Sequence, residues 1–259
     1  MCMKRIASIA MLAAGLSTGA HAGASPACHA RSGEHVVPLV ELYTSEGCDS
    51  CPAADRWLSA RFAAASANDA VALAFHVDYW DRLGWKDRFA TAAFTQRQHD
   101  AMRANRATFV YTPQVLLQGG DFRQWRGDAF DRRVSAVRKQ SARVRIVADV
   151  AMENGNVVVH ADIARPAGSR DNAIVGVAYV DSGLVTQVRA GENRGARLVH
   201  DHVVRAFHAQ RVGERPSTVR VVLARPAEAG AHPRIVVFVQ DAATGGVEQT
   251  LDVPLTSCV

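Results

Sequence analysis

The residues best suited to chemistry in this chain are two cysteines in the stretch TSEGCDSCP, Cys48 and Cys51. Two cysteines separated by two residues can form a redox pair, supply two metal ligands, or close a structural disulfide. An apolar run over 36–42 precedes them, and Pro52 suits the first turn of a helix. A helix N-terminus stabilises a thiolate. The spacing therefore favours redox exchange, with Cys48 as the attacking, more exposed thiol and Cys51 as the resolving thiol.

This chemistry depends on the compartment, and the first residues of the chain predict export. Lys4 and Arg5 are followed by an apolar segment over 6–16 and then by small residues. This is the composition of a secretory signal peptide, which we place at 1–24. The apolar segment is shorter than the roughly 20 residues that cross a bilayer. We therefore expect a periplasmic or secreted protein, in an oxidising compartment where disulfides persist.

The remaining cysteines predict a second disulfide. Removal of the leader takes Cys2 away and leaves four cysteines, which allow three connectivities. Since Cys48 and Cys51 are the obvious local pair, Cys28 and Cys258 are left as partners by elimination. A bridge between them would be structural and would tie the ends of the mature chain together.

Composition and charge exclude several classes of protein. The chain has 259 residues, 48% of them hydrophobic, which is enough for one large domain or two ordinary ones. Without the leader, 28 of the 30 basic residues remain against 25 acidic ones, a balance too mild to predict nucleic-acid binding. No later apolar stretch can span a membrane, and no motif predicts a cofactor. The expected partners are protein thiols and disulfides, or a redox partner protein.

The hydrophobic pattern changes near residue 141. Before it, apolar runs and helical spacing alternate in the order β-α-β-α-β-β-α, with the first strand directly before the two cysteines. After it, apolar and polar residues alternate with period two, and Asn154-Gly155 marks a hairpin. The pattern predicts an α/β domain over 33–140, followed by a mostly antiparallel, sandwich-like β domain over 141–259.

Four strings carry a resemblance to known proteins: VELYTSEGCDSCPAAD, HVDYWDRLGWKD, YTPQV and RAGENRGARLVHDHVVR. Through them the chain is similar to the thioredoxin superfamily and, more closely, to the exported bacterial family DUF1223. The resemblance implies a thioredoxin-like first half, an appended β region and no settled activity. It also implies a cis peptide between Thr112 and Pro113, beside the active cysteines. Unlike ordinary thioredoxins, the chain places Glu46 and Asp49 next to Cys48, where both oppose thiolate formation.

Further side chains are candidates for proton transfer or substrate binding. Glu41 is a carboxylate inside an apolar strand, and thioredoxins carry on that strand a buried acid that accepts the second cysteine's proton. The alternative is a structural pair with an arginine. Tyr79 and Trp80 either line a groove for an unfolded thiol substrate or cap the core. The backbone at Thr112 is expected to pair with a substrate chain.

Two alternatives to redox exchange stay open. In the first, the protein is a non-catalytic binding or envelope-assembly protein whose disulfides are structural. In the second, it is a copper chaperone in which Cys48 and Cys51 hold the metal with His76 as a third ligand. His200 and His202 would place two imidazoles on one face of a strand, but a third ligand is not identifiable there, and we predict no metal site.

Overall fold

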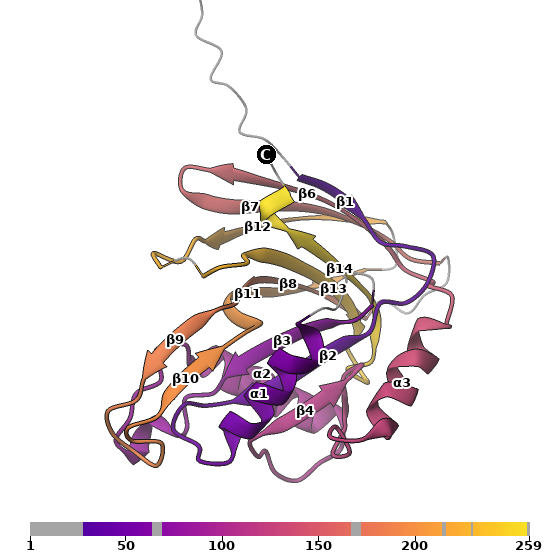
Figure 1. Ribbon diagram of the computed structural model, residues 1–259. Coiled ribbons are helices and arrows are strands. Elements are labelled where there is room, and N and C mark those ends of the chain that lie inside the picture. The colour runs from indigo at the N-terminus through magenta and orange to yellow at the C-terminus, as the bar shows by residue number, and fades with distance from the viewer. Residues whose placement is uncertain (1–27, 64–68, 167–171, 214–215, 229, 258–259) are drawn as a thin grey trace, which may run out of the picture.

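The computed structural model describes residues 28–63, 69–166, 172–213, 216–228 and 230–257. The predicted leader and Cys258 lie outside these residues, so the signal peptide and the Cys28–Cys258 bridge stay predictions. The Sγ atom of Cys28 lies 3.9 Å from the carbonyl oxygen of Pro254. The two ends of the described chain therefore come together (Figure 1).

Fourteen strands and three α-helices make up the regular structure of the described residues, with 3-10 turns at Asp81–Leu83 and Leu255–Ser257. The helices are α1 (Cys51–Phe62), α2 (Ala92–Ala104) and α3 (Asp128–Arg138). The strands that precede α3 are β1 (Cys28–Arg31), β2 (Leu39–Thr44), β3 (Val71–His76), β4 (Gln114–Leu117) and β5 (Gly120–Asp121). The strands that follow it are β6 (Arg145–Glu153), β7 (Asn156–Ala164), β8 (Ala173–Asp181), β9 (Leu184–Gln187), β10 (Arg197–His200), β11 (Val203–Val212), β12 (Ser217–Ala224), β13 (Arg234–Asp241) and β14 (Val247–Pro254).

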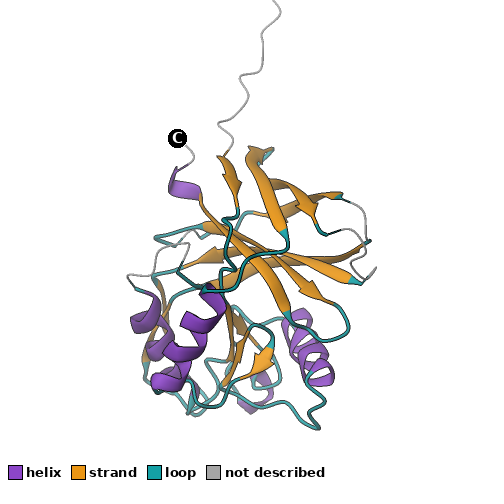
Figure 2. Ribbon diagram, turned by 90° about the vertical axis from the view of Figure 1, so that its right-hand side faces the viewer, coloured by secondary structure: helices purple, strands orange, loops and turns teal. Residues whose placement is uncertain are grey.

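Eight of these strands form one mixed sheet in the order β14-β13-β8-β11-β3-β2-β4-β5. Strands β2 and β3 are parallel, as strands joined through a helix should be, and β4 pairs antiparallel with the other side of β2. A second sheet, β1-β6-β7-β12, packs its apolar side chains on those of β8, β13 and β14. The helices gather at one end of the molecule, and the other end is built of strands (Figure 2).

The predicted fold class is wrong, because the first half does not form an α/β thioredoxin-like domain of its own. Strand β3 pairs in parallel with β11, with Val203 opposite Ala74, so the sheet continues without a break into β8, β13 and β14. At this edge of β3 the Ala74 N–H donates to the His202 carbonyl, directly before β11, at 2.7 Å. The described chain is mostly β. The last α-helix of the described residues, α3, ends at Arg138, and the regular elements from Arg145 to Pro254 are strands.

The side chains of β2 alternate between two cores. Val40 and Leu42 pack with Leu58 of α1, whereas Tyr43 packs with Phe94 of α2. Helices α1 and α2 therefore lie on opposite faces of the sheet. Because successive strand residues point to opposite faces, each residue of β2 faces one helix or the other.

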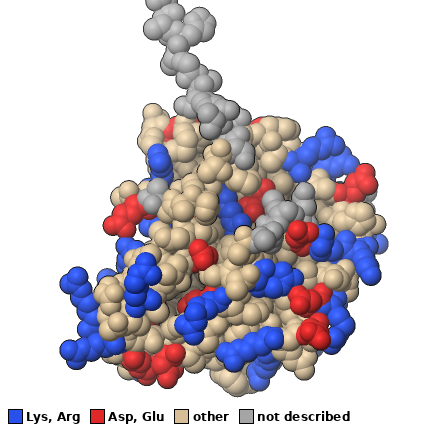
Figure 3. Space-filling view, viewed as in Figure 1, with Lys and Arg blue, Asp and Glu red and all other residues tan. Residues whose placement is uncertain are grey.

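The surface carries mixed charge, and the helices are short. None of the helices within the described ranges is long and apolar enough to cross a lipid bilayer. On the face shown in Figure 3, Lys and Arg side chains are interspersed with Asp and Glu. Exposed ion pairs such as Arg61 with Asp131, 2.8 Å apart, and Arg138 with Asp69, 2.7 Å apart, occur on the surface. Charges of both signs are thus mixed on the visible face (Figure 3).

Candidate functional site

Cys48 and Cys51 form a disulfide at the start of α1, with Cα atoms 5.4 Å apart. Cys51 is the first residue of the helix, and Pro52 follows in the first turn, where its missing N–H is no loss. Cys48 lies in the preceding turn. Its N–H donates to the Ser45 carbonyl at 3.2 Å, and its own carbonyl accepts from the Cys51 N–H at 3.3 Å. The pair therefore lies at the end of the helix that favours negative charge on sulfur.

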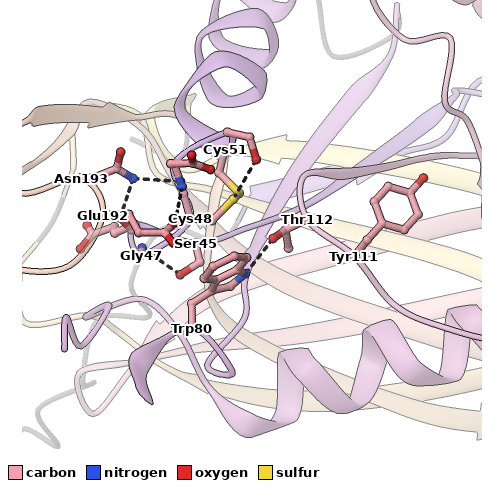
Figure 4. The surroundings of a disulfide bond; sticks show 12 residues. Ser45, Gly47, Cys48, Cys51, Trp80, Tyr111, Thr112, Glu192 and Asn193 are labelled. Atoms are coloured by element: carbon pink, nitrogen blue, oxygen red, sulfur yellow. Dashed lines mark hydrogen bonds between the residues drawn. A yellow bond between two sulfur atoms is a disulfide. The ribbon is translucent and has the colours of Figure 1, made fainter. Parts of the chain in front are cut away.

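Both cysteines are fully buried, with exposed fractions of 0%. The prediction that Cys48 is the more exposed thiol concerns the reduced protein and stays a prediction, since both cysteines are equally buried in the disulfide form. Trp80 packs closely on the turn at Gly47. A Cβ atom added to Gly47 would lie only 3.1 Å from the Trp80 Cβ. The Trp80 indole N–H donates to the Thr112 hydroxyl at 2.8 Å, and both side chains lie beside the disulfide (Figure 4). Trp80 and Thr112 thus border the disulfide, as their predicted role requires.

The loop that joins β9 to β10 holds the other side of the turn. The Asn193 side-chain amide donates to the carbonyls of Glu46, at 2.9 Å, and Cys48, at 2.8 Å. The Glu192 carboxylate accepts from the N–H of Asp49 at 3.2 Å. Figure 4 shows Asn193 and Glu192 on the side of the turn opposite Thr112. A loop from the second half of the chain therefore fastens the cysteine turn.

Two buried imidazole–carboxylate pairs lie next to this turn. The Nδ1 atom of His76 is 2.6 Å from Oδ2 of Asp87, and both side chains are at most 1% exposed. The Nε2 atom of His200 is 3.2 Å from Oε1 of Glu46, again with both side chains buried. The two imidazole rings are 5.1 Å apart, and the Trp85 indole N–H donates to Glu46 at 2.7 Å. We call Glu46, His76, Asp87 and His200 the buried acid–imidazole cluster.

The His76–Asp87 pair stabilises its own charges. Burial is the largest single effect and disfavours the imidazolium, but the carboxylates of Asp87, Asp55 and Glu46, with Asp87 contributing most, together outweigh it and raise the pKa of His76. Burial also disfavours the carboxylate, yet His76 and the N–H groups of Glu46 and Phe89 lower the pKa of Asp87. His76 therefore keeps its proton at pH values where a free histidine loses it.

Asp55 adds a carboxyl group one helical turn after Cys51, on the same face of α1. Burial raises the pKa of Asp55, and His76 and His200 offset part of this effect. Several buried atoms of this region have no hydrogen-bond partner of suitable geometry among the described residues: Thr44 Oγ1, Glu46 Oε1, His76 Nε2 and both ring nitrogens of His200. A carboxyl group with a raised pKa and imidazole nitrogens without a hydrogen bond can supply or accept the protons that thiol chemistry moves.

The family model described as "Protein of unknown function (DUF1223)" matches residues 39–240, well over half of the chain. The chain belongs to the DUF1223 family. The matched range includes the cysteine turn, the buried acid–imidazole cluster and the β9–β10 loop, so the whole site lies inside the DUF1223 match.

Two solved structures resemble this DUF1223 chain. Protein AGR_C_4864 from Agrobacterium tumefaciens is 27% identical, with a TM-score of 0.60 over 86% of this chain and 96% of that one. HBP35 of Porphyromonas gingivalis has a TM-score of 0.63 over 85% of this chain and 75% of that one, at 10% identity. An identity that low supports a shared fold alone. The curated proteins contain no match to the chain.

Pro113, Tyr79 and Trp80 were also predicted as site residues. The Thr112–Pro113 peptide is cis, as predicted, and β4 begins directly after it. Tyr79 and Trp80 are half-buried and pack on the apolar core below α2. Their core contacts agree with the alternative in which they cap the core, although Trp80 also contacts the cysteine turn.

Glu41 lies apart from this site, on the face of the sheet that α2 covers. Its carboxylate accepts two hydrogen bonds from Arg97, at 2.9 and 3.0 Å, and one from the Tyr43 hydroxyl at 3.0 Å. The Arg97 guanidinium also lies about 5 Å from three aromatic rings, those of Phe75, Phe207 and Phe238. These contacts agree with the structural arginine pair that was the alternative to a catalytic Glu41.

His200 and His202 do not share a strand face, contrary to prediction. Strand β10 ends at His200, and His202 lies in the following turn with a φ of 59°. The Nδ1 atom of His202 is 2.6 Å from Arg234, and burial together with this guanidinium lowers the pKa of His202 to about 3. Within the described ranges, no group of three or more His, Cys, Asp and Glu is arranged to hold a metal ion, so the copper alternative gains no support.

Four residues of the site were not singled out from the sequence: Asp55, Asp87, Glu192 and Asn193. Asp55 had a signal, because it follows Cys51 by four residues in a predicted helix and must share its face. The other three reach the site from distant loops, and their spacing along the chain carries no such signal.

Proposed function

We propose that this protein exchanges disulfide bonds with the thiols of other polypeptides through Cys48 and Cys51. The observation that carries the proposal is the position of the disulfide, at the N-terminus of α1 and next to buried acid and imidazole groups with unpartnered atoms. We also propose that it acts outside the cytosol. The composition of residues 1–24 and the disulfide itself support export.

The exchange needs one attack, one leaving thiolate and one proton donor. A substrate thiolate attacks Sγ of Cys48, the Cys48–Cys51 bond breaks, and Cys51 leaves with the electron pair. Asp55, whose pKa burial raises, is the nearest acid on the same face of α1 and is the proposed proton donor to the Cys51 thiolate. The second thiolate of the substrate then attacks the substrate sulfur of the mixed disulfide, and Cys48 leaves with the electron pair. Solvent protonates Cys48 and returns a proton to Asp55, which balances the two protons that the substrate thiols lost to solvent on ionising. The substrate leaves as a disulfide, and its two electrons reside on the reduced Cys48 and Cys51 thiols.

Access requires the cysteine turn to open, because both cysteines are fully buried. The bond from Asp49 to Glu192 is exposed and the two bonds from Asn193 are partly buried, and hydrogen bonds of this kind can be exchanged for bonds to water at a modest net cost. Movement of the β9–β10 loop would expose Sγ of Cys48 without unfolding α1. Loop opening of this kind is a common step in enzymes with covered sites.

A second function is favoured by one specific observation. The full burial of both cysteines suits a structural disulfide in a non-catalytic binding or envelope-assembly protein. In that case the bond closes the turn before α1 and is never exchanged. A structural disulfide has a low reduction potential and resists reduction by the thiol pool of its compartment.

Exchange kinetics separate the two functions. The oxidised protein is mixed with a dithiol peptide, and formation of the peptide disulfide is followed over a range of pH. We expect exchange by the wild type, none by Cys48→Ser or Cys51→Ser, and an altered pH profile for Asp55→Asn. Asp131→Asn, which changes an exposed acid of α3, is the matched control. A wild type that transfers no disulfide and stays oxidised in excess dithiol would refute exchange and support the structural function.

A further inference from the structure

A surface hollow beside the segment that leads to Thr112 is not used by the exchange chemistry. Its volume is about 270 Å³, and its lining is mainly aromatic: Phe109, Tyr111, Arg123 and Trp125. A second, more open hollow shares Arg123 and Trp125 with the first, and residues 123–129 and Arg132 line it. We call the two hollows together the aromatic–arginine shelf.

The shelf exposes apolar surface on a rigid base. Phe109 is 59% exposed, more than any other large hydrophobic residue that the structure describes. Trp125 is buried and packs on Trp57 of α1, with ring centroids 4.9 Å apart. An exposed ring beside an anchored one provides contact area at a low cost in conformational entropy, which is typical of a recognition surface.

The charged side chains of the shelf are mostly basic and are held by the aromatic rings. The guanidinium of Arg123 lies 5.3 Å from the ring centroid of Tyr111, and that of Arg126 lies 4.4 Å from the ring centroid of Trp125. Three arginines line the shelf, whereas its lining has one acidic residue, Asp128. Ordered guanidinium groups are suited to bind carboxylates through paired hydrogen bonds.

The shelf is continuous with the surroundings of the disulfide through the segment before β4. Tyr111 is followed by Thr112, whose hydroxyl accepts from Trp80 beside the disulfide (Figure 4). The Tyr111 carbonyl accepts from Gln98 at 2.8 Å, and its hydroxyl donates to Asp121 at 2.7 Å. Asp121 also accepts from Nε of Arg123 at 3.2 Å. The segment is thus fixed between the shelf and the cysteine turn.

We propose that the aromatic–arginine shelf binds the part of a substrate polypeptide that flanks its cysteine, and that this part carries acidic side chains next to an aromatic one. The assignment of the occupant as a substrate rests on the proposed disulfide exchange. The acidic groups bind Arg123 and Arg126, and the aromatic group packs on Phe109. The substrate class is therefore an extended, acidic, thiol-bearing polypeptide.

Binding is tested without any redox step. The probe is a synthetic peptide with Asp, Glu and Phe beside a serine that replaces the substrate cysteine, and a matched peptide carries Asn and Gln in place of the acids. Isothermal titration should show the acidic peptide bound roughly 10-fold more tightly, as expected for charge-assisted pairs. The double variant Arg123→Glu/Arg126→Glu should lose this preference. Arg220→Glu, which reverses an exposed charge on β12, should keep it.

Each outcome bears on one proposal. Equal affinity for the two peptides would overturn the proposed binding of acidic peptides at the shelf. A preference for the acidic peptide that persists in Arg123→Glu/Arg126→Glu would overturn it as well. Phe109→Ser, at an exposed position, should weaken both peptides and preserve the preference; unchanged affinity overturns the aromatic contact. Exchange with dithiothreitol is measured in parallel on the same samples. Exchange without peptide binding overturns the shelf alone. Binding without exchange overturns the proposed function and the assignment of the occupant as a substrate, and leaves the shelf as a binding surface for acidic peptides.

Discussion

Replacing Glu41 by Gln should destabilise the fold and leave disulfide exchange intact. Glu41 and Arg97 form a buried pair whose side chains are 3% and 12% exposed. Glu41→Gln keeps the size of the side chain and removes its charge. The Arg97 guanidinium, held among three aromatic rings, then loses the carboxylate that it binds through two hydrogen bonds.

The expected magnitude follows from the asymmetry of buried ion pairs. Breaking such a pair by removing one partner costs about 3–5 kcal/mol, because an uncompensated charge is left behind. For a chain of this size that loss corresponds to a fall in Tm of roughly 6–20 °C. Asp131→Asn is the matched control, since Asp131 and its partner Arg61 are 61% and 36% exposed. Exposed pairs contribute about 0–1 kcal/mol, so the control should change little.

Urea denaturation and thermal melts measure the loss, and the dithiol-peptide assay at a temperature where the variant is folded measures exchange. The triple variant Glu41→Leu/Tyr43→Phe/Arg97→Met removes both charges and the hydroxyl that donates to Glu41. It should recover most of the stability that Glu41→Gln loses, because no buried charge is left unpaired. A triple variant as unstable as the single one would refute the reasoning. Lost exchange in folded Glu41→Gln would restore a catalytic function for Glu41.

Other consequences of the structure are open to direct measurement. Asn193→Ala removes two hydrogen bonds from the cysteine turn, so dithiothreitol should reduce Cys48–Cys51 roughly 10-fold faster; an unchanged rate would show that the loop does not control access. The unfolding free energy should fall as pH rises above 6.5 through the raised pKa of His76, and should also fall in acid, as pH drops below 3.8 through the lowered pKa of Asp87. In His76→Gln, denaturation curves measured at a series of pH values should show a smaller fall in unfolding free energy above pH 6.5. A fall that remains in this variant must come from another titrating group. Burial and Asp121 raise the pKa of Tyr111 to about 12, and its phenolate absorbance in a pH titration should shift toward 10 in Asp121→Asn.

Local features of the site were predictable because they depend on neighbours in the chain. The spacing of Cys48 and Cys51 before Pro52 predicted a disulfide at a helix start, and both are present. The cis peptide before Pro113 was implied by the resemblance of the sequence and is present. Asp55 could have been added on the same grounds, since helical spacing alone places it on the face of Cys51.

The fold class failed for a physical reason. Hydrophobic alternation identifies a strand and its buried face, but it does not identify the strand that pairs with it. The apolar pattern of β3 is the same whether its outer edge faces solvent or pairs with another strand. That β11 pairs there, with Val203 opposite Ala74, depends on how the second half of the chain packs.

The sequence by itself determined the disulfide, the helix that begins at Cys51 and the family to which the chain belongs. Only the tertiary structure decided which distant groups surround the disulfide. Asn193 reaches the cysteine turn across about 145 residues of chain, and His200 meets Glu46 because β10 ends beside the sheet that carries β2. Such contacts form when separate apolar surfaces are buried against each other, and burial is non-directional. The polar groups that burial brings together are therefore not encoded in any local pattern.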